Sequence, residues 1–237
     1  MRDMTEDLVG LVPPPEEPEP AGGSLPESVV LPGDYLHFLS VYGVGTFDMF
    51  LHVMAPERSD GRANVRERTA SFWSVLARML EPNPTVEPLR GMLGAGAGVF
   101  DPVTPLADSL RAAASVAVWG STDNGDLCLW VVPAEGGDGF VLVIGSRFED
   151  WYEYGVSITE FLHRILTGGI RCPAFPEDFP STGETPPSRD LTAIEELFST
   201  RHSFLTGDQC IRVMDAWPAP WKTIQEEQRK QGGTESG

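Results

Sequence analysis

The chain has 237 residues, of which 41% are hydrophobic and 22% charged, and this favours one globular domain with flanking tails. Its 17 Lys and Arg against 35 Asp and Glu give a net charge of −18, which repels nucleic acid and anionic membranes and attracts basic proteins. No run of about eighteen apolar residues is present, and the N-terminus lacks the basic and apolar regions of a signal peptide. We therefore expect a cytoplasmic protein that binds neither nucleic acid nor membranes.

The two ends of the chain differ in composition from its middle. Residues 1–30 include a stretch rich in Pro, Glu and Gly with almost nothing to bury, so we predict a disordered Pro/Glu-rich arm. Residues 31–180 are predicted to form the folded domain, and their nineteen acids and ten arginines carry half of the net charge. Residues 181–237 are predicted to be a C-terminal helical extension with a polar tail, with helices near 191–198 and 221–231.

Three segments in the first half of the domain show periodic patterns. Apolar residues recur at helical spacing from Pro32 to Gly43, which predicts a short amphipathic helix with a glycine stop. Residues 46–54 alternate apolar and polar side chains, the period-two pattern of a half-buried strand, and Pro56 ends it. An apolar stripe predicts a longer surface helix over residues 62–81.

The second half of the domain contains the best-defined strands. Residues 115–120, 126–132 and 140–146 are rich in Val, Leu and Trp, and Asn-Gly and Gly-Gly turn signals separate them. This pattern predicts an antiparallel meander at the centre of a sheet. Ser157 and Glu160 then form a capping box that begins a helix, which two glycines end.

Residues that could carry catalysis or bind a metal are scattered. The histidines stand alone, without the spacing of a known catalytic or metal motif: His37, His52, His163 and His202. The three cysteines are far apart and odd in number, so we predict reduced thiols that pack as small hydrophobes. The Gly-rich stretch 91–102 lacks the Lys-Ser/Thr of a phosphate loop and is predicted to be a flexible connection. We predict no catalytic residue, no cofactor and no metal, and hence no enzyme.

One short segment, from Asp123 to Asp126, allows two interpretations. Asp123, Asn124 and Asp126 bring oxygen-bearing side chains together, as a cation site requires. An EF-hand loop would also need Glu135 as its last ligand, which is reached only by counting through a strand. The same residues tolerate left-handed backbone conformations, so a hairpin turn is the simpler prediction. Trp and Tyr residues nearby favour core packing or a protein interface, because strong negative charge opposes stacking on nucleic acid.

Three segments carry a recognisable order. Residues 31–56 contain a Leu-Pro, a helix with Asp-Tyr and a glycine-containing lead into a strand. Residues 119–130 contain a Gly-Asp before a hydrophobic strand. Residues 148–168 contain an aromatic stretch before a helix. This order resembles the SUKH superfamily. The resemblance implies an α+β fold with a single mixed, mainly antiparallel sheet and flanking helices, in agreement with the periodic patterns. The Pro/Glu-rich arm and residues 181–237 depart from the family pattern.

The resemblance also implies a function. Many bacterial SUKH proteins are similar to immunity proteins that bind toxins, often nucleases or deaminases, whereas fungal members act as regulatory hubs. We expect an immunity-type protein that neutralises a basic, nuclease-like toxin by direct occlusion. The expected partner-binding residues are acids near turns and strand ends: Asp123, Asp126, Glu149, Asp150 and Glu153.

Three alternatives stay open from the sequence. A non-enzymatic regulatory scaffold would use the same fold, with the arm and the tail as docking segments. A ligand-binding protein or enzyme would need a converging polar pocket. Acidity that serves only solubility is the third alternative. The sequence predicts no particular oligomeric state.

Overall fold

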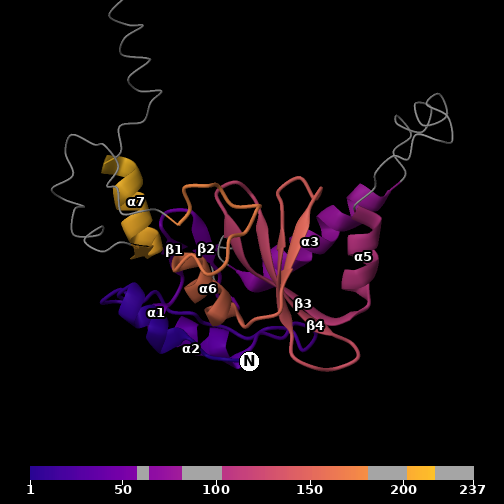
Figure 1. The fold of residues 1–237 in the computed structure, drawn as a ribbon, viewed down its shortest axis with the longest axis horizontal. Helices are drawn as coiled ribbons and strands as arrows, with labels where there is room; N and C mark the ends of the chain where they lie inside the picture. Colours follow the sequence, from indigo (N-terminus) through magenta and orange to yellow (C-terminus); the bar gives the residue numbers. More distant parts are fainter. Residues whose placement is uncertain (58–63, 82–102, 181–201, 217–237) are drawn as a thin grey trace, which may run out of the picture.

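The computed structural model describes residues 1–57, 64–81, 103–180 and 202–216, and over these residues the chain is an α+β fold of six helices and seven strands (Figure 1). The helices are α1 (Thr5–Leu11), α2 (Gly33–Tyr42), α3 (Val65–Leu80), α5 (Val103–Arg111), α6 (Ile158–Leu166) and α7 (Gly207–Ala216). The strands are β1 (Gly45–Phe47), β2 (Leu51–Val53), β3 (Ala113–Thr122), β4 (Leu127–Pro133), β5 (Phe140–Ile144), β6 (Trp151–Tyr154) and β7 (Phe204–Leu205). The predicted fold class is confirmed.

All seven strands form one sheet in the order β6-β5-β4-β3-β2-β1-β7. Every pairing between these strands is antiparallel, so the described sheet is not mixed. The predicted meander is confirmed as β3, β4 and β5, whose buried Val, Leu and Trp side chains make up the centre of the sheet. Gly125, with φ of 88°, closes the β3–β4 turn at the predicted Asn-Gly signal.

Helices cover both faces of the sheet. Tyr35 of α2 and Phe161 of α6 contact Trp119 from one face, at ring-centroid distances of 5.7 and 6.2 Å. On the opposite face, the Thr69 hydroxyl of α3 accepts a 2.9 Å hydrogen bond from the Val118 amide. Figure 1 shows α6 in front of the sheet and α3 behind it. The core is therefore two layers of apolar side chains, one on each face of the central strands.

The predicted helices around the sheet are confirmed with small differences in their ends. Helix α2 ends at Gly43, whose φ of 68° and close approach to the Glu19 carbonyl leave no room for a Cβ atom. Helix α3 begins after Asn64, and α6 begins after Ser157, whose hydroxyl accepts from the Glu160 amide at 3.2 Å. Helix α5 and strand β6 were not predicted, although α5 buries Leu106, Ala107 and Leu110 on one face.

The single strand predicted over residues 46–54 is wrong. The chain reverses there, and β1 pairs antiparallel with β2 across a turn in which Asp48 and Met49 have φ of 47° and 55°. No glycine marks this turn, so the apolar alternation looked continuous. The turn is stabilised instead from outside: the Asp48 carboxylate binds the amide of Ser203, which lies 155 residues away in sequence.

The disordered arm predicted over residues 1–30 is also wrong at its N-terminal end. Helix α1 packs on α2 and α6 with Leu8 and Val12 fully buried. The Thr159 hydroxyl accepts from the Met4 amide at 3.0 Å, and the Tyr42 hydroxyl donates to the Val12 carbonyl at 2.6 Å. Leu8 and Val12 lie one helical turn apart, and the partly buried Val9 and Leu11 also pack on the core, so this short helix docks although its first turn is acidic.

The C-terminal region contributes to the sheet. Strand β7 pairs with β1 at one sheet edge, and α7 packs on both strands with Val213 buried. The folded unit therefore extends past the predicted boundary at residue 180. The two helices predicted near 191–198 and 221–231, and the glycine-rich connection 91–102, lie outside the described residues.

Candidate functional site

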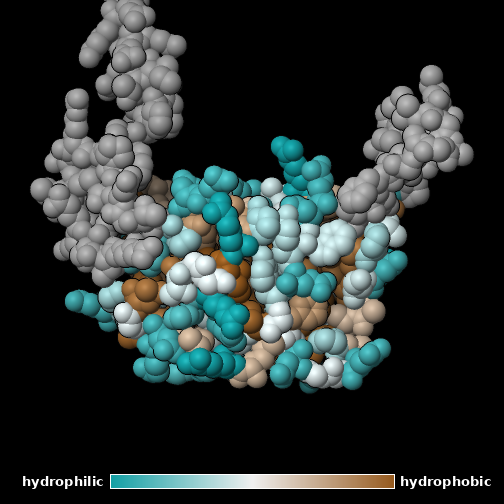
Figure 2. Space-filling view, viewed as in Figure 1, coloured by the Kyte–Doolittle hydropathy of each residue, from teal (hydrophilic) through white to brown (hydrophobic). Residues whose placement is uncertain are grey.

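Three hairpin turns meet at one end of the sheet, because β1–β2, β3–β4 and β5–β6 all reverse on the same side. The Asp123 amide donates to the Phe50 carbonyl at 3.1 Å, which joins the first two turns. The Ser146 amide donates to the Asp126 carboxylate at 3.0 Å, which joins the second and third. We call residues 48–50, 123–126 and 145–150 the turn end. In Figure 2 hydrophilic residues gather along the upper margin of the molecule, where Figure 1 shows these turns.

Three of the five predicted partner-binding residues are exposed on the turn end. Asp123 lies on the β3–β4 turn with 59% of its side chain exposed. Glu149 and Asp150 lie exposed on the β5–β6 turn, where Asp150 accepts a 2.7 Å hydrogen bond from the Tyr152 hydroxyl. The fourth, Glu153, is exposed but lies along β6 opposite Leu142, away from the turns. The structure therefore brings together only part of the predicted set.

Asp126 is misplaced as a surface residue, because only 3% of it is exposed. Its carboxylate accepts from the Thr122 hydroxyl at 2.6 Å and from the Ser146 amide at 3.0 Å. Asp126 therefore binds the second turn to the third and does not face a partner. Its carboxylate points inward while that of Asp123 points toward His52, so the two do not form a cation site, and the hairpin-turn prediction is confirmed.

His52 is a residue that the sequence did not connect to any site. Its Nε2 lies 2.6 Å from the Asp123 carboxylate, and its Nδ1 lies 3.0 Å from the Thr46 hydroxyl, its cross-strand neighbour. A hydroxyl, an imidazole and a carboxylate in a row are the parts with which hydrolases activate a nucleophile. Here the Thr46 side chain is buried within the sheet. Only the β1–β2 pairing that the structure revealed could have pointed to this row.

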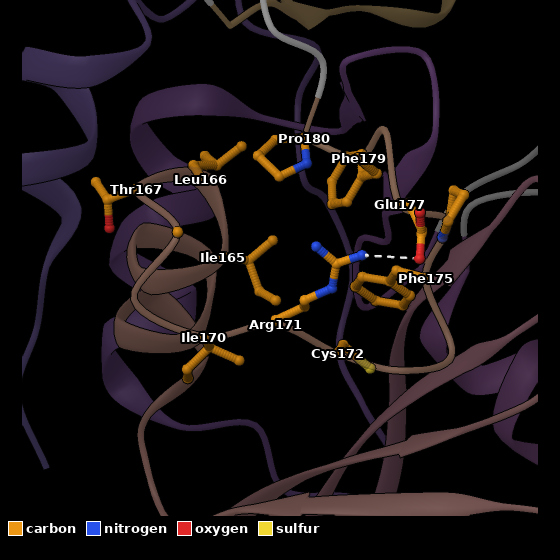
Figure 3. Close-up of a pocket in the computed structure, with 12 residues that line it drawn as sticks. Ile165, Leu166, Thr167, Ile170, Arg171, Cys172, Phe175, Glu177, Phe179 and Pro180 are labelled. Atoms are coloured by element: carbon orange, nitrogen blue, oxygen red, sulfur yellow. Dashed lines mark ion pairs between the residues drawn. The ribbon is translucent and has the colours of Figure 1, made fainter.

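A cavity of about 220 Å³ lies beside the turn end, between the last turn of α6 and residues 170–180. Its walls include Ile165, Leu166 and Phe175, and Figure 3 shows Arg171 crossing it toward Glu177. Phe50 of the first turn contacts Phe175 and Phe179 at ring-centroid distances of 5.6 and 4.7 Å, so the cavity adjoins the turn end. We call this space the α6 cavity.

The thiols near these features are held in their protonated form. Burial raises the pKa of Cys172, which lines the α6 cavity, and of Cys128 behind it. Burial likewise raises the pKa of Cys210, whose Sγ lies 3.9 Å from the Leu205 carbonyl. A thiol with a raised pKa is a poor nucleophile, so these cysteines act as packed side chains.

Metal-binding groups do not converge in the part of the chain that the structure describes, where no three His, Cys, Asp or Glu side chains are grouped suitably for an ion. Among the same residues, no helix has both the length and the apolar character needed to cross a membrane. The arrangement that does stand out is an exposed acidic surface with a cavity of mixed polar and apolar lining at its side. Comparison with protein-family models, with curated proteins and with solved structures found no match to this chain.

Proposed function

We propose that this chain is an immunity-type protein that binds a basic, nuclease-like toxin at its turn end and blocks it by occlusion. The observation that carries the proposal is the convergence of three exposed acids, Asp123, Glu149 and Asp150, on two turns that hydrogen bonds hold together. The resemblance of residues 31–168 to the SUKH superfamily supports the same function.

Charge and shape support this mode of binding. The net charge of −18 attracts a basic protein from a distance, and acids concentrated on one surface orient it during the encounter. Exposed Glu177 and Asp178 extend the acidic surface toward the α6 cavity. Half-buried Trp151 and Phe179 offer apolar contact once water is displaced. A nuclease or deaminase that binds nucleic acid has a basic active-site surface, for which this acidic surface is a direct competitor.

The row formed by Thr46, His52 and Asp123 has a structural role in this mode of binding. The Thr46 hydroxyl is buried where α7 packs on β1, next to Cys210, so a substrate cannot reach it without displacing α7. His52 instead fixes the position of the Asp123 carboxylate, which reduces the conformational freedom that this acid would lose on binding.

The test measures binding of the purified chain to the toxin encoded beside it, by surface plasmon resonance at 50 and 300 mM salt. We expect a tight complex whose association rate falls as salt rises. The triple variant Asp123→Lys, Glu149→Lys, Asp150→Lys should associate about 10- to 100-fold more slowly at low salt, because it replaces attraction by repulsion at the contact surface.

A matched control reverses the same number of charges away from the turn end. The control combines substitutions of three exposed acids: Asp108→Lys, Glu135→Lys and Asp138→Lys. Asp108 lies on α5, and Glu135 and Asp138 lie in the β4–β5 turn at the opposite end of the sheet. The control variant should slow association by less than about threefold at 300 mM salt, where long-range effects are screened. Equal losses in the two triple variants at high salt would contradict the turn end as the binding surface.

A further inference from the structure

A largely exposed cationic side chain of the chain itself, that of Arg171, lies across the mouth of the α6 cavity. Figure 3 shows the Arg171 guanidinium between Ile165 and Phe175, directed at Glu177. The nearest nitrogen of Arg171 lies 3.6 Å from the Glu177 carboxylate, which is longer than a hydrogen bond. The two side chains are 70% and 96% exposed, so this ion pair contributes little to stability and exchanges easily.

The surroundings of this position favour a cation. Helix α6 ends at Leu166, and Leu166 and Thr167 line the cavity, so the negative end of the helix dipole faces it. Glu177 stands on the opposite rim, and the walls between combine polar groups with the apolar side chains of Ile165, Ile170 and Phe175. Such a space suits a side chain with an apolar stem and a charged head, because the stem contacts the walls while the head stays at the rim.

We propose that the α6 cavity receives an arginine side chain of the toxin and that Arg171 occupies the same place while the chain is free. This inference rests on the proposed function, because it names the residue type by which the basic partner is anchored. On binding, the incoming guanidinium takes the position beside Glu177, and Arg171 moves into solvent. The partner loses little by this exchange, since the displaced pair is long and exposed.

Arginine fits this cavity better than lysine. Its planar guanidinium can donate two parallel hydrogen bonds to the Glu177 carboxylate, whereas Arg171 reaches that carboxylate only at 3.6 Å. A guanidinium is also less strongly hydrated than an ammonium, so it is transferred more readily to a rim beside apolar side chains. Arginine is among the residue types that most often anchor protein interfaces.

The experiment uses a small probe, so that it does not depend on the toxin. n-Butylguanidinium carries the stem and head of an arginine, and n-butylurea is its neutral analogue of nearly the same shape. In NMR titrations of the full chain, butylguanidinium should shift the methyl signals of Ile165 and Ile170 and the amide signal of Gly168, saturating with a Kd on the order of 10 mM. Butylurea should bind at least about fivefold more weakly, because it lacks the charge.

Three variants test the exchange itself. Arg171→Met keeps an apolar stem and removes the occupant, so butylguanidinium should bind about two- to fivefold more tightly. Arg147→Met removes an exposed arginine from the turn end and controls for the change in net charge, with an expected effect below about 1.5-fold. Glu177→Gln should abolish the preference for butylguanidinium over butylurea.

The outcomes separate this inference from the proposed function. Absence of saturable shifts at these residues in both the natural chain and Arg171→Met overturns the cavity as an arginine site, as does equal binding of the two probes. If butylguanidinium binds as expected but the toxin forms no complex, the cavity stands and the immunity function fails. If the toxin binds and Glu177→Gln leaves its affinity unchanged, the arginine anchor is refuted while the immunity function stands.

Discussion

Asp48 joins the first hairpin turn to the C-terminal strand through buried hydrogen bonds. Its carboxylate lies 3.0 Å from His202 Nδ1 and accepts a 2.7 Å hydrogen bond from the Ser203 amide. The Asp48 and His202 side chains are each only 1% exposed. Strand β7 consists of just Phe204 and Leu205, so these hydrogen bonds add to the ring contacts of Phe204 in holding β7 to the sheet.

Substituting Asp48→Ala should destabilise the fold strongly. Removing the carboxylate leaves the Ser203 amide and the buried His202 ring nitrogen without their hydrogen-bond partner, which costs about 1–3 kcal/mol for each group. Asp48 also has a φ of 47°, and alanine in this left-handed region adds about 1 kcal/mol of strain. The total is a large share of the roughly 5–15 kcal/mol by which a domain is stable. Asp48→Asn tolerates the backbone and keeps an acceptor for Ser203, so it should cost only about 1–3 kcal/mol.

The assay is urea unfolding, followed by circular dichroism, with hydrogen exchange of the β7 amides. We expect Asp48→Ala to lower the unfolding midpoint more than Asp48→Asn does, and to speed exchange at Phe204 and Leu205 before the rest of the sheet opens. Asp108→Ala is the control, since Asp108 is exposed and its ion pair with Arg111 is long, so a change below about 0.5 kcal/mol is expected. A cost below about 1 kcal/mol for Asp48→Ala would refute the role of these hydrogen bonds.

Three further predictions follow from buried groups. Leu8→Ala should destabilise the chain by about 2–5 kcal/mol in urea unfolding, because Leu8 is fully buried. The control Glu6→Ala should leave stability unchanged, since Glu6 is exposed. Equal unfolding midpoints for the two variants would mean that α1 does not belong to the core. Tyr35→Phe should cost about 1–2 kcal/mol in the same assay, since the Tyr35 hydroxyl donates within the core and accepts from the Met54 amide, and an unchanged midpoint would argue against this network. Burial raises the pKa of Tyr35 and Tyr42, so both keep their protons in the fold, whereas tyrosine in the unfolded chain loses its proton near pH 10. The free energy of unfolding should therefore fall as the pH rises above about 10. A urea unfolding midpoint that stays constant up to about pH 11.5 would contradict this.

The strands and helices with strong local patterns could be predicted from the sequence. The runs that became β3, β4 and β5 are rich in Val, Leu and Trp and are separated by glycine turns, so their conformation depends on residues close in sequence. The capping box of Ser157 and Glu160 predicted the start of α6 for the same reason. Local propensity and pattern agree with the fold at these positions, and the prediction needed no distant contact.

The candidate site could be predicted only in part. Asp123, Glu149 and Asp150 are exposed acids on turns, as their neighbours in sequence suggested. Asp126 has a similar sequence environment but is buried, because the amide of Ser146 from another turn completes its hydrogen bonds. Arg171 and its cavity were not predicted, since the cavity exists only where residues 170–180 fold back on α6.

The sequence by itself therefore determined the fold class, the central strands and the acidic character of the turns, because these follow from composition and short-range pattern. Only the tertiary structure decided the reversal at Asp48, the docking of α1 through Leu8, and the pairing of His52 with Asp123. Each of these depends on contacts between residues far apart in sequence, whose energies exceed the local preferences of the chain and leave no periodic trace in it.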